Sequence, residues 1–287
     1  MKITLFPYIG GKSMHFDWII QFFPQHKAYV EVFGGSAAIL LNKPRSEIEV
    51  YNDIDDNLVK LFRVLRDKEK SQELYRKLKY TLYARSELEL AGEILKNKEK
   101  HDDITIAWAV YVAARMSFGS RIYSPTFSYS SEKVGKSKTY FDSLRNLILI
   151  KKRLENVIIE NLDWEDCMNR YDNENTLFYL DPPYPIEILN SDKVYTIDNG
   201  FRTLEQHRVF LEKLKKYKGM IILSGYENDV YNEVLSDWHI ERRKTYSPTA
   251  TFHYKHKENH SPTRVEVIWI NPQCLARLNQ LKLFQIL

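Results

Sequence analysis

The sequence predicts an α/β fold: a doubly wound, mostly parallel sheet with helices on both faces and a helical insert. Short apolar runs alternate with helical patterns along the chain. A glycine-rich turn follows the first apolar run, and a long helical stretch at residues 57–155 separates the second run from the third. Because 44% of the 287 residues are hydrophobic and 28% are charged, the chain can form a packed core, which excludes disorder of the whole chain.

Seven segments have the composition of strands. Five of them predict the parallel part of the sheet, at residues 29–33, 48–52, 157–161, 176–180 and 220–223. The last two predict an antiparallel pair separated by a long polar loop, at residues 239–245 and 265–270. Gly34, Gly35 and Ser36 follow the first strand, and a helix is predicted to begin at Ala37–Leu41.

The helical patterns divide the chain into two domains. Four helices are predicted between the second and third strands, at residues 58–65, 73–95, 104–116 and 143–154. We therefore expect a discontinuous domain of residues 1–62 and 151–287, and a helical insert of residues 63–150. A capping box at Thr203–Gln206 opens a later helix, which Gly219 is predicted to end.

Several classes of protein are excluded or disfavoured. No apolar run approaches the ~20 residues of a membrane helix, and the N-terminus lacks the apolar core of a signal peptide. Cys167 and Cys274 cannot supply a disulfide framework or a four-thiolate metal site. His253, His256 and His260 have spacing that could hold zinc, but no thiolate accompanies them, so no metal is expected. We expect a reduced, cytoplasmic protein.

The positive charge is concentrated in two segments. Residues 115–153 carry nine Lys or Arg against two acidic residues, a net of +7. Residues 239–264 carry six against two, a net of +4, although the whole chain has a net charge of only +4. A mildly acidic body with two basic segments is common in proteins that bind polyanions, but solvated basic loops would give the same pattern.

The turn at Gly34 and Gly35 and the carboxylate of Asp53 predict a nucleoside-binding site. A glycine turn after a first strand lets main-chain N–H groups approach a ligand closely. Asp53 ends the next strand, from which a carboxylate can accept hydrogen bonds from ribose hydroxyls. The full Gly-x-Gly-x-x-Gly is missing, which favours S-adenosylmethionine over a nicotinamide dinucleotide. An ordinary turn that needs glycine fits equally well.

Asp181-Pro-Pro-Tyr184 ends the fourth predicted strand. At average compositions this tetrapeptide occurs by chance in about one chain in a thousand of this size. The Asp181 carboxylate can accept one N–H of an aromatic amine, and the Pro182 carbonyl, held by Pro183, can accept the other. Tyr184 offers a flat face for stacking on a base. The alternative is a proline-rich turn that stops the strand.

Five motifs together resemble the Dam-like, D12 class of DNA adenine N6-methyltransferases. They occur in the order of the α arrangement and lie at Phe6–Lys12, Tyr29–Ser36, Tyr51–Asp53, Leu162–Trp164 and Asp181–Tyr184. The resemblance implies a seven-stranded, Rossmann-like methyltransferase sheet, S-adenosylmethionine as cofactor, and an adenine flipped out of the duplex. Its implied catalytic residues are Asp181, Pro182, Pro183 and Tyr184. Its implied cofactor residues are Tyr8, Gly11, Lys12, Glu31, Phe33, Gly34, Gly35, Ser36, Asp53, Leu162, Asp163 and Asp181.

The insert is expected to read double-stranded DNA. The predicted DNA contacts are Arg115, Ser117, Arg121, Lys133, Lys136, Lys138 and Arg243. The target sequence stays open, because Met116–Arg121 replaces the Asn-Gly-Phe/Leu-x-Arg stretch of GATC-reading members. Residues 186–202 are expected to close over the flipped base.

Two other functions remain open: methylation of RNA or of a protein amide, and DNA binding without turnover. We expect a monomer or weak dimer, encoded by a bacterium or a phage, and a cognate restriction endonuclease stays open as a partner. The C-terminal apolar run from Leu275 to Leu287 has helical spacing, and packing on the body of the protein is favoured over a dimer contact.

Overall fold

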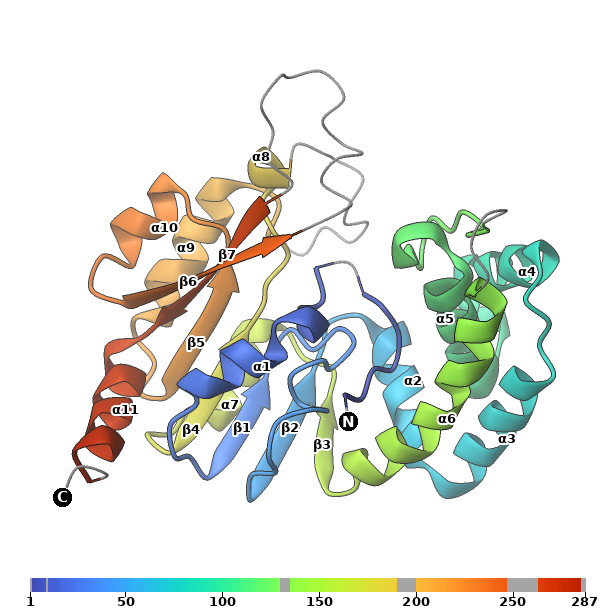
Figure 1. Cartoon of the computed structure of the whole chain (residues 1–287), viewed down its shortest axis with the longest axis horizontal. Coiled ribbons are helices and arrows are strands. Elements are labelled where there is room, and N and C mark those ends of the chain that lie inside the picture. The colour runs from blue at the N-terminus through green and yellow to red at the C-terminus, as the bar shows by residue number, and fades with distance from the viewer. Residues whose placement is uncertain (1, 9, 130–134, 190–199, 247–262, 285–287) are drawn as a thin grey trace. The chain divides into compact units, whose positions relative to one another are not determined.

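The computed structural model describes residues 2–8, 10–129, 135–189, 200–246 and 263–284 (Figure 1). In these residues the strands form a seven-stranded sheet of order β3-β2-β1-β4-β5-β7-β6, which is parallel except where β7 pairs with its neighbours. This confirms the predicted fold class. The chain divides into two compact units, residues 1–22 with 27–171 and residues 23–26 with 172–287.

The first unit contains three parallel strands, β1 (Ala28–Glu31), β2 (Ile48–Asn52) and β3 (Val157–Glu160). Val50 in β2 pairs with Val30 in β1 and with Ile158 in β3. β2 is buried from Glu49 to Asn52, as expected for the central strand of the three. The predicted bounds of β2 are confirmed, whereas β1 ends two residues earlier than predicted.

Helices make up most of the rest of the first unit. The α-helices are α1 (Phe16–Ile19), α2 (Asp56–Arg66), α3 (Lys68–Lys79), α4 (Arg85–Lys96), α5 (Asp103–Met116), α6 (Lys136–Leu154) and α7 (Trp164–Tyr171). The 3-10 helices are η1 (Lys12–Met14), η2 (Ile20–Phe22), η3 (Lys98–Lys100) and η4 (Phe118–Ser120).

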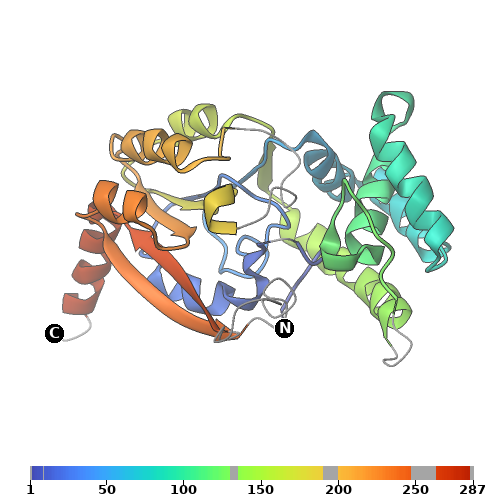
Figure 2. The same ribbon diagram turned by 90° about the horizontal axis from the view of Figure 1, so that it is seen from above.

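α5 is the central helix of this group. Ten of its 14 residues are buried, and it packs against α2, α3, α4 and α6 (Figure 2, green and teal ribbons). The prediction of one helix at residues 73–95 is wrong, because α3 and α4 are separate. Thr81 lies in the break, where its hydroxyl accepts a hydrogen bond from the Trp108 indole of α5 at 2.8 Å. The predicted insert, residues 63–150, lies within the first unit, and its boundaries stay a prediction.

The second unit contains β4 (Thr176–Leu180), β5 (Met220–Gly225), β6 (His239–Tyr246) and β7 (Thr263–Ile270). Every residue of β4 and β5 is buried, and these two strands are parallel. β7 runs antiparallel to both β5 and β6, which confirms the predicted final pair.

The helices of the second unit are α8 (Ile186–Leu189), α9 (Leu204–Leu214), α10 (Asp229–Val234) and α11 (Pro272–Phe284). Thr203 and Gln206 form the predicted capping box at the start of α9. The prediction that Gly219 ends this helix is wrong, because α9 stops at Leu214. Gly219 instead precedes β5, where an added Cβ would lie 2.6 Å from the ring of Phe178. The predicted C-terminal helix is confirmed for the residues of α11.

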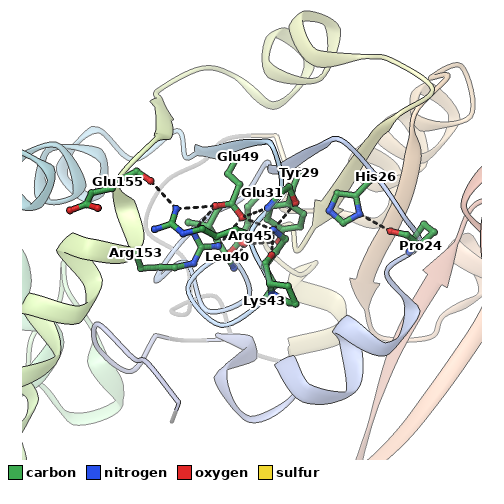
Figure 3. Close-up of polar contacts among 12 residues, drawn as sticks. Pro24, His26, Tyr29, Glu31, Leu40, Lys43, Arg45, Glu49, Arg153 and Glu155 are labelled. Carbon is green, nitrogen blue, oxygen red and sulfur yellow. Dashed lines mark hydrogen bonds and ion pairs between the residues drawn. The ribbon is translucent and has the colours of Figure 1, made fainter.

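A buried ionic cluster joins β2 to the end of α6 (Figure 3). The Glu49 carboxylate accepts hydrogen bonds from Lys43 at 2.5 Å and from both terminal nitrogens of Arg153 at 2.5 and 2.8 Å. Burial opposes ionisation of Glu49, but the hydrogen bonds from Arg153 and Lys43 still hold its pKa below the ordinary value. Burial lowers the pKa of Lys43, whose ammonium also lies 4.4 Å from the centre of the Tyr29 ring.

Glu49→Ala should destabilise the protein by about 3–5 kcal/mol, because it leaves the Lys43 and Arg153 cations buried without their anion. Chemical denaturation measures the change in the free energy of unfolding. The matched control is Glu233→Ala, which breaks an exposed pair with Arg208 and should change stability far less, because solvent screens that pair. Equal losses in the two variants would contradict the role of the cluster.

Candidate active site

The chain forms a tight turn after β1. Gly35 has a positive φ of 50° and Ala37 one of 54°. An added Cβ at Gly34 would lie 2.2 Å from the ring of Tyr51, so only glycine fits there. The prediction of a helix from Ala37 to Leu41 is wrong, because these residues form turns. The turns are supported by Glu31, whose carboxylate accepts the N–H of Leu40 at 2.7 Å.

Asp53 fixes this turn to the end of β2. Its carboxylate accepts the N–H of Gly35 at 2.7 Å and the N–H of Asp55 at 2.9 Å. Burial raises the pKa of Asp53 to about 7, although these main-chain hydrogen bonds act in the opposite direction. Each carboxylate oxygen still has acceptor capacity for a further donor.

The N-terminal segment packs against the same turn. An added Cβ at Gly35 would lie 3.0 Å from the ring of Tyr8. An added Cβ at Gly11 would lie 3.2 Å from the Cβ of Tyr8 and 3.6 Å from the hydroxyl of Ser36. Lys12 is buried and donates to the carbonyl of Gly10 at 2.9 Å. The structure therefore brings Tyr8, Gly11, Gly35 and Ser36 together.

Asn52 connects the turn to the segment after β3. Its side chain donates to the carbonyls of Val32 at 2.9 Å and Leu162 at 3.1 Å, and accepts the N–H of Leu162 at 2.9 Å. Asp163 is exposed, and its carboxylate accepts the N–H of Glu165 in the first turn of α7 at 2.9 Å. Asn52 was absent from the predicted site residues, although it belongs to the Tyr51–Asp53 motif.

Two predicted cofactor residues lie at the beginning of the turn. Glu31 is buried, and the same oxygen that accepts from Leu40 also accepts the hydroxyl of Tyr29 at 2.7 Å. These contacts make Glu31 a support for the turn. Phe33 is half-buried, one residue before Gly34.

Tyr123, from the loop after η4, contacts the start of α2. Its hydroxyl donates to the carboxylate of Asp55, and Asn57 donates to the Tyr123 oxygen at 3.0 Å. Asp55 also caps α2 by accepting the N–H of Asn57, and burial raises its pKa. Sequence reasoning missed Tyr123 and Asp55. The acidic run Asp53–Asp56 was the available signal for Asp55, whereas Tyr123 carried none.

In the second unit, Asp181 and Tyr184 follow β4. The Tyr184 hydroxyl donates to a carboxylate oxygen of Asp181 at 3.0 Å. Pro182 and Tyr184 are buried, and Tyr184 exposes only 4% of its surface. In this state the acceptor of Asp181 is therefore satisfied by Tyr184, and the Tyr184 ring is covered.

Two residues missed by the predicted site list extend this group. The ring of Tyr226 lies 4.8 Å from that of Tyr184, and its hydroxyl donates to Glu266 in β7 at 3.1 Å. The other carboxylate oxygen of Glu266 is buried and has no hydrogen-bond partner among the residues that the structure describes. Glu266 falls in the strand predicted at residues 265–270, and Tyr226 follows the strand predicted at residues 220–223.

The predicted DNA contacts have different surroundings. The guanidinium of Arg115 donates to the carbonyls of Thr4 and Leu5, and Ser117 is buried with its hydroxyl accepting the N–H of Thr126. Both support neighbouring backbone, so we do not propose them as DNA contacts. Of the other predicted contacts, Arg121 and Arg243 are half-buried, and Lys136 and Lys138 are exposed. Lys133 lies outside the described residues.

Within the described residues, no three His, Cys, Asp or Glu side chains are grouped to hold a metal ion. His253, His256 and His260 lie outside that part of the chain, as do residues 190–199 of the predicted closing segment. Cys167 and Cys274 are both buried. No helix among the described residues is both long enough and apolar enough to cross a membrane.

The comparison with protein families identifies the chain. A model of the D12 class N6 adenine-specific DNA methyltransferase family matches residues 8–251. The chain belongs to this family. It is therefore an adenine-specific DNA methyltransferase, and the resemblance carried by its motifs is confirmed. No curated protein matches the chain. In this methyltransferase the family match includes both the glycine turn and the Asp181–Tyr184 motif.

Asp53→Asn should remove a pH-dependent destabilisation of the cofactor-free enzyme. The folded pKa of about 7 lies above the ordinary value of 3.8, so the folded state binds this proton more tightly than the unfolded state. The contribution of Asp53 to stability therefore falls as pH rises from about 4 to about 7. The difference in melting temperature, variant minus wild type, should therefore increase as the pH is raised from about 5 to about 8.

The matched control is Asp166→Asn, at an exposed position in α7. Its melting temperature should follow that of the wild type across the same range. If the difference in melting temperature between Asp53→Asn and wild type stays constant with pH, burial does not raise the pKa of the Asp53 carboxyl.

Proposed function

We propose that this methyltransferase transfers a methyl group from S-adenosylmethionine to the N6 amine of an adenine that has been flipped out of double-stranded DNA. The observation that carries the proposal is the Asp181-Pro-Pro-Tyr184 motif directly after β4, with Asp181 and Tyr184 in hydrogen-bond contact. Membership of the adenine-specific family supports the choice of base.

The residues of the first unit fit a nucleoside cofactor. Gly34 and Gly35 let the turn pack closely against the rings of Tyr51 and Tyr8. The buried carboxylate of Asp53, which holds the N–H of Gly35, can also accept ribose hydroxyls. Tyr8, Gly11, Lys12, Ser36, Phe33, Leu162 and Asp163 complete the proposed cofactor residues. When bound, S-adenosylmethionine supplies a methyl group on a positively charged sulfur.

Asp181 and Pro182 prepare the amine. The nitrogen lone pair of an adenine amine is delocalised into the ring, which makes it a poor nucleophile. Two acceptors, the Asp181 carboxylate and the Pro182 carbonyl, hold both N–H groups and favour a nitrogen with an available lone pair. The amine gains the methyl group and loses one proton, for which Asp181 is the nearest proposed acceptor. Pro183 restricts the Pro182 backbone and keeps its carbonyl in place.

Tyr184 changes its contacts when the base binds. In the structure its hydroxyl donates to one oxygen of Asp181, and in this proposal the adenine amine takes over that acceptor when the base binds. The freed ring can then stack on the flipped base, which offsets part of the few kcal/mol needed to remove that base from the duplex. This exchange leaves the Asp181 acceptor satisfied both before and after binding.

We assign DNA binding to the insert, residues 63–150, and cofactor binding and catalysis to residues 1–62 and 151–287. Lys136 and Lys138 are exposed at the start of α6 and are proposed phosphate contacts, with Arg121, Arg243 and Lys133. Phosphate contacts position DNA without reading its sequence, so the target sequence must be determined by experiment.

Asp181→Ala should lower methyl transfer from labelled S-adenosylmethionine to unmethylated double-stranded DNA at least ~100-fold, because the amine loses its charged acceptor. The measurement is the label in N6-methyladenine, followed by methylation-sensitive sequencing to find the target. Asp166→Ala, an exposed position on α7, should retain wild-type activity. The proposal would be refuted if Asp181→Ala transferred as much label to N6-methyladenine as the wild type, or if the label appeared in RNA rather than in DNA.

The double variant Lys136→Ala, Lys138→Ala should weaken DNA binding and reduce its dependence on salt. Each lost phosphate contact lowers the slope of log K against log salt by about 0.9, so the two together should change it by about 2. Cofactor affinity should stay the same. The matched control is Lys216→Ala, Lys218→Ala, two exposed lysines outside the basic segments. An unchanged salt slope in the first variant would exclude Lys136 and Lys138 as phosphate contacts.

A further inference from the structure

His207 is a buried histidine that the proposed reaction does not use. It lies in α9 and is 0% exposed. Its Nδ1 is 2.7 Å from the hydroxyl of Tyr231, and its Nε2 is 3.3 Å from the carbonyl oxygen of Phe201. A fully buried imidazole with partners on both nitrogens is held in one orientation.

These partners determine which nitrogen carries the proton. A carbonyl oxygen can only accept, so Nε2 carries the hydrogen and donates it to Phe201. Nδ1 is then the acceptor, and the Tyr231 hydroxyl donates to it. Burial lowers the pKa of His207 to about 4, against the opposing effect of the carbonyls of Phe201 and Pro183. The imidazole is therefore neutral at physiological pH.

The same imidazole fixes main chain that is hydrogen-bonded to the end of the catalytic motif. Nε2 of His207 donates to the carbonyl of Phe201, and the next residue, Arg202, accepts the main-chain N–H of Ile186 at 2.9 Å. Ile186 lies two residues beyond Tyr184, so the position of Phe201 and Arg202 restricts the direction in which the chain leaves the motif.

Tyr231 anchors this arrangement in the core. It is 1% exposed, and its ring lies 4.9 Å from that of Trp269 in β7. A fixed core side chain therefore holds His207 in place.

We propose that His207 is a positioning residue, which holds the Asp181–Tyr184 motif in its reactive geometry. It binds the main chain at Phe201, next to the Arg202–Ile186 hydrogen bond, while Tyr231 fixes the imidazole. The inference rests on the proposed function, because the motif must be the one that binds the amine. His207 itself touches neither the base nor the cofactor in this scheme.

Kinetics of His207 variants test this role. His207→Phe keeps the bulk but has no donor, and should lower kcat about 10- to 100-fold, as expected when reacting groups are misplaced. KM for S-adenosylmethionine should change less than about twofold, because the change acts on the motif and not on cofactor binding. His207→Gln places an amide N–H near the position of Nε2 and should recover most of kcat. Tyr231→Phe should lower kcat by an intermediate factor.

A matched control separates positioning from loss of stability. Leu214→Ala truncates a buried apolar position at the end of the same helix and should lower the melting temperature while leaving kcat unchanged well below it. If His207→Phe folds and keeps wild-type kcat, or if His207→Gln is no better than His207→Phe, the positioning role is wrong. If His207→Phe does not fold, Tyr231→Phe decides: an unchanged kcat overturns the proposal.

Nitrogen NMR of the imidazole gives a readout without turnover. The wild-type enzyme should show His207 neutral with hydrogen on Nε2 at about pH 7, and a charged ring or hydrogen on Nδ1 would overturn the proposal. Asp181→Ala should abolish methyl transfer while leaving this signal in place. If the proposed function is wrong, the wild-type enzyme does not methylate DNA. If the positioning role is wrong, the NMR signal shows a charged ring or hydrogen on Nδ1, or kcat does not change in the His207 variants.

Discussion

The buried residue Asp53 joins three segments of the first unit, two through its carboxylate and one through its main-chain carbonyl. One oxygen accepts the N–H of Gly35 in the turn after β1, and the other accepts the N–H of Asp55 before α2. The Asp53 carbonyl accepts the side chain of Asn161, which follows β3. These contacts set the main chain of Gly35 in its positive φ conformation and bring Gly34 against the Tyr51 ring. The proposed cofactor site thus depends on one buried acidic side chain whose carboxylate is satisfied by main-chain N–H groups.

Local sequence signals predicted most of the sheet and both chemical motifs, because their causes are local. β2 is an apolar run bounded by polar residues, and the capping box at Thr203 uses side chains three residues apart. The Asp181–Tyr184 motif is contiguous, so its position after β4 could be predicted from the strand pattern alone.

The failures have non-local causes. Ala37–Leu41 has the composition of a helix, but the distant Glu31 and the positive φ of Ala37 impose turns. The break between α3 and α4 depends on a hydrogen bond from Trp108, 27 residues beyond Thr81. Arg115 is a predicted DNA contact on its charge alone, and no local pattern indicates that its guanidinium donates to the carbonyls of Thr4 and Leu5, more than a hundred residues earlier. Distances of this kind cannot be read from one sequence.

Hydrogen-bonded tyrosines recur around the proposed chemistry. Tyr184 satisfies Asp181, Tyr226 satisfies one oxygen of Glu266, and Tyr231 fixes His207. In each case a phenol hydroxyl provides a donor to a buried acceptor, while its ring fills apolar space. Of the three, only Tyr184 must release its acceptor for the proposed reaction, whereas the proposed role of Tyr231 requires its bond to persist.

The hydrogen bond from Tyr123 to Asp55 has a consequence for exchanging target specificity between enzymes of this kind. Tyr123 lies in the loop of the predicted insert, and Asp55 caps α2 two residues beyond Asp53. A loop transplanted from a relative would remove the donor that satisfies this buried carboxylate. The chimera would then carry an unsolvated charge beside its cofactor residues, even if every new base contact were correct. An exchangeable loop therefore has to bring a hydroxyl donor for Asp55 together with its new recognition residues.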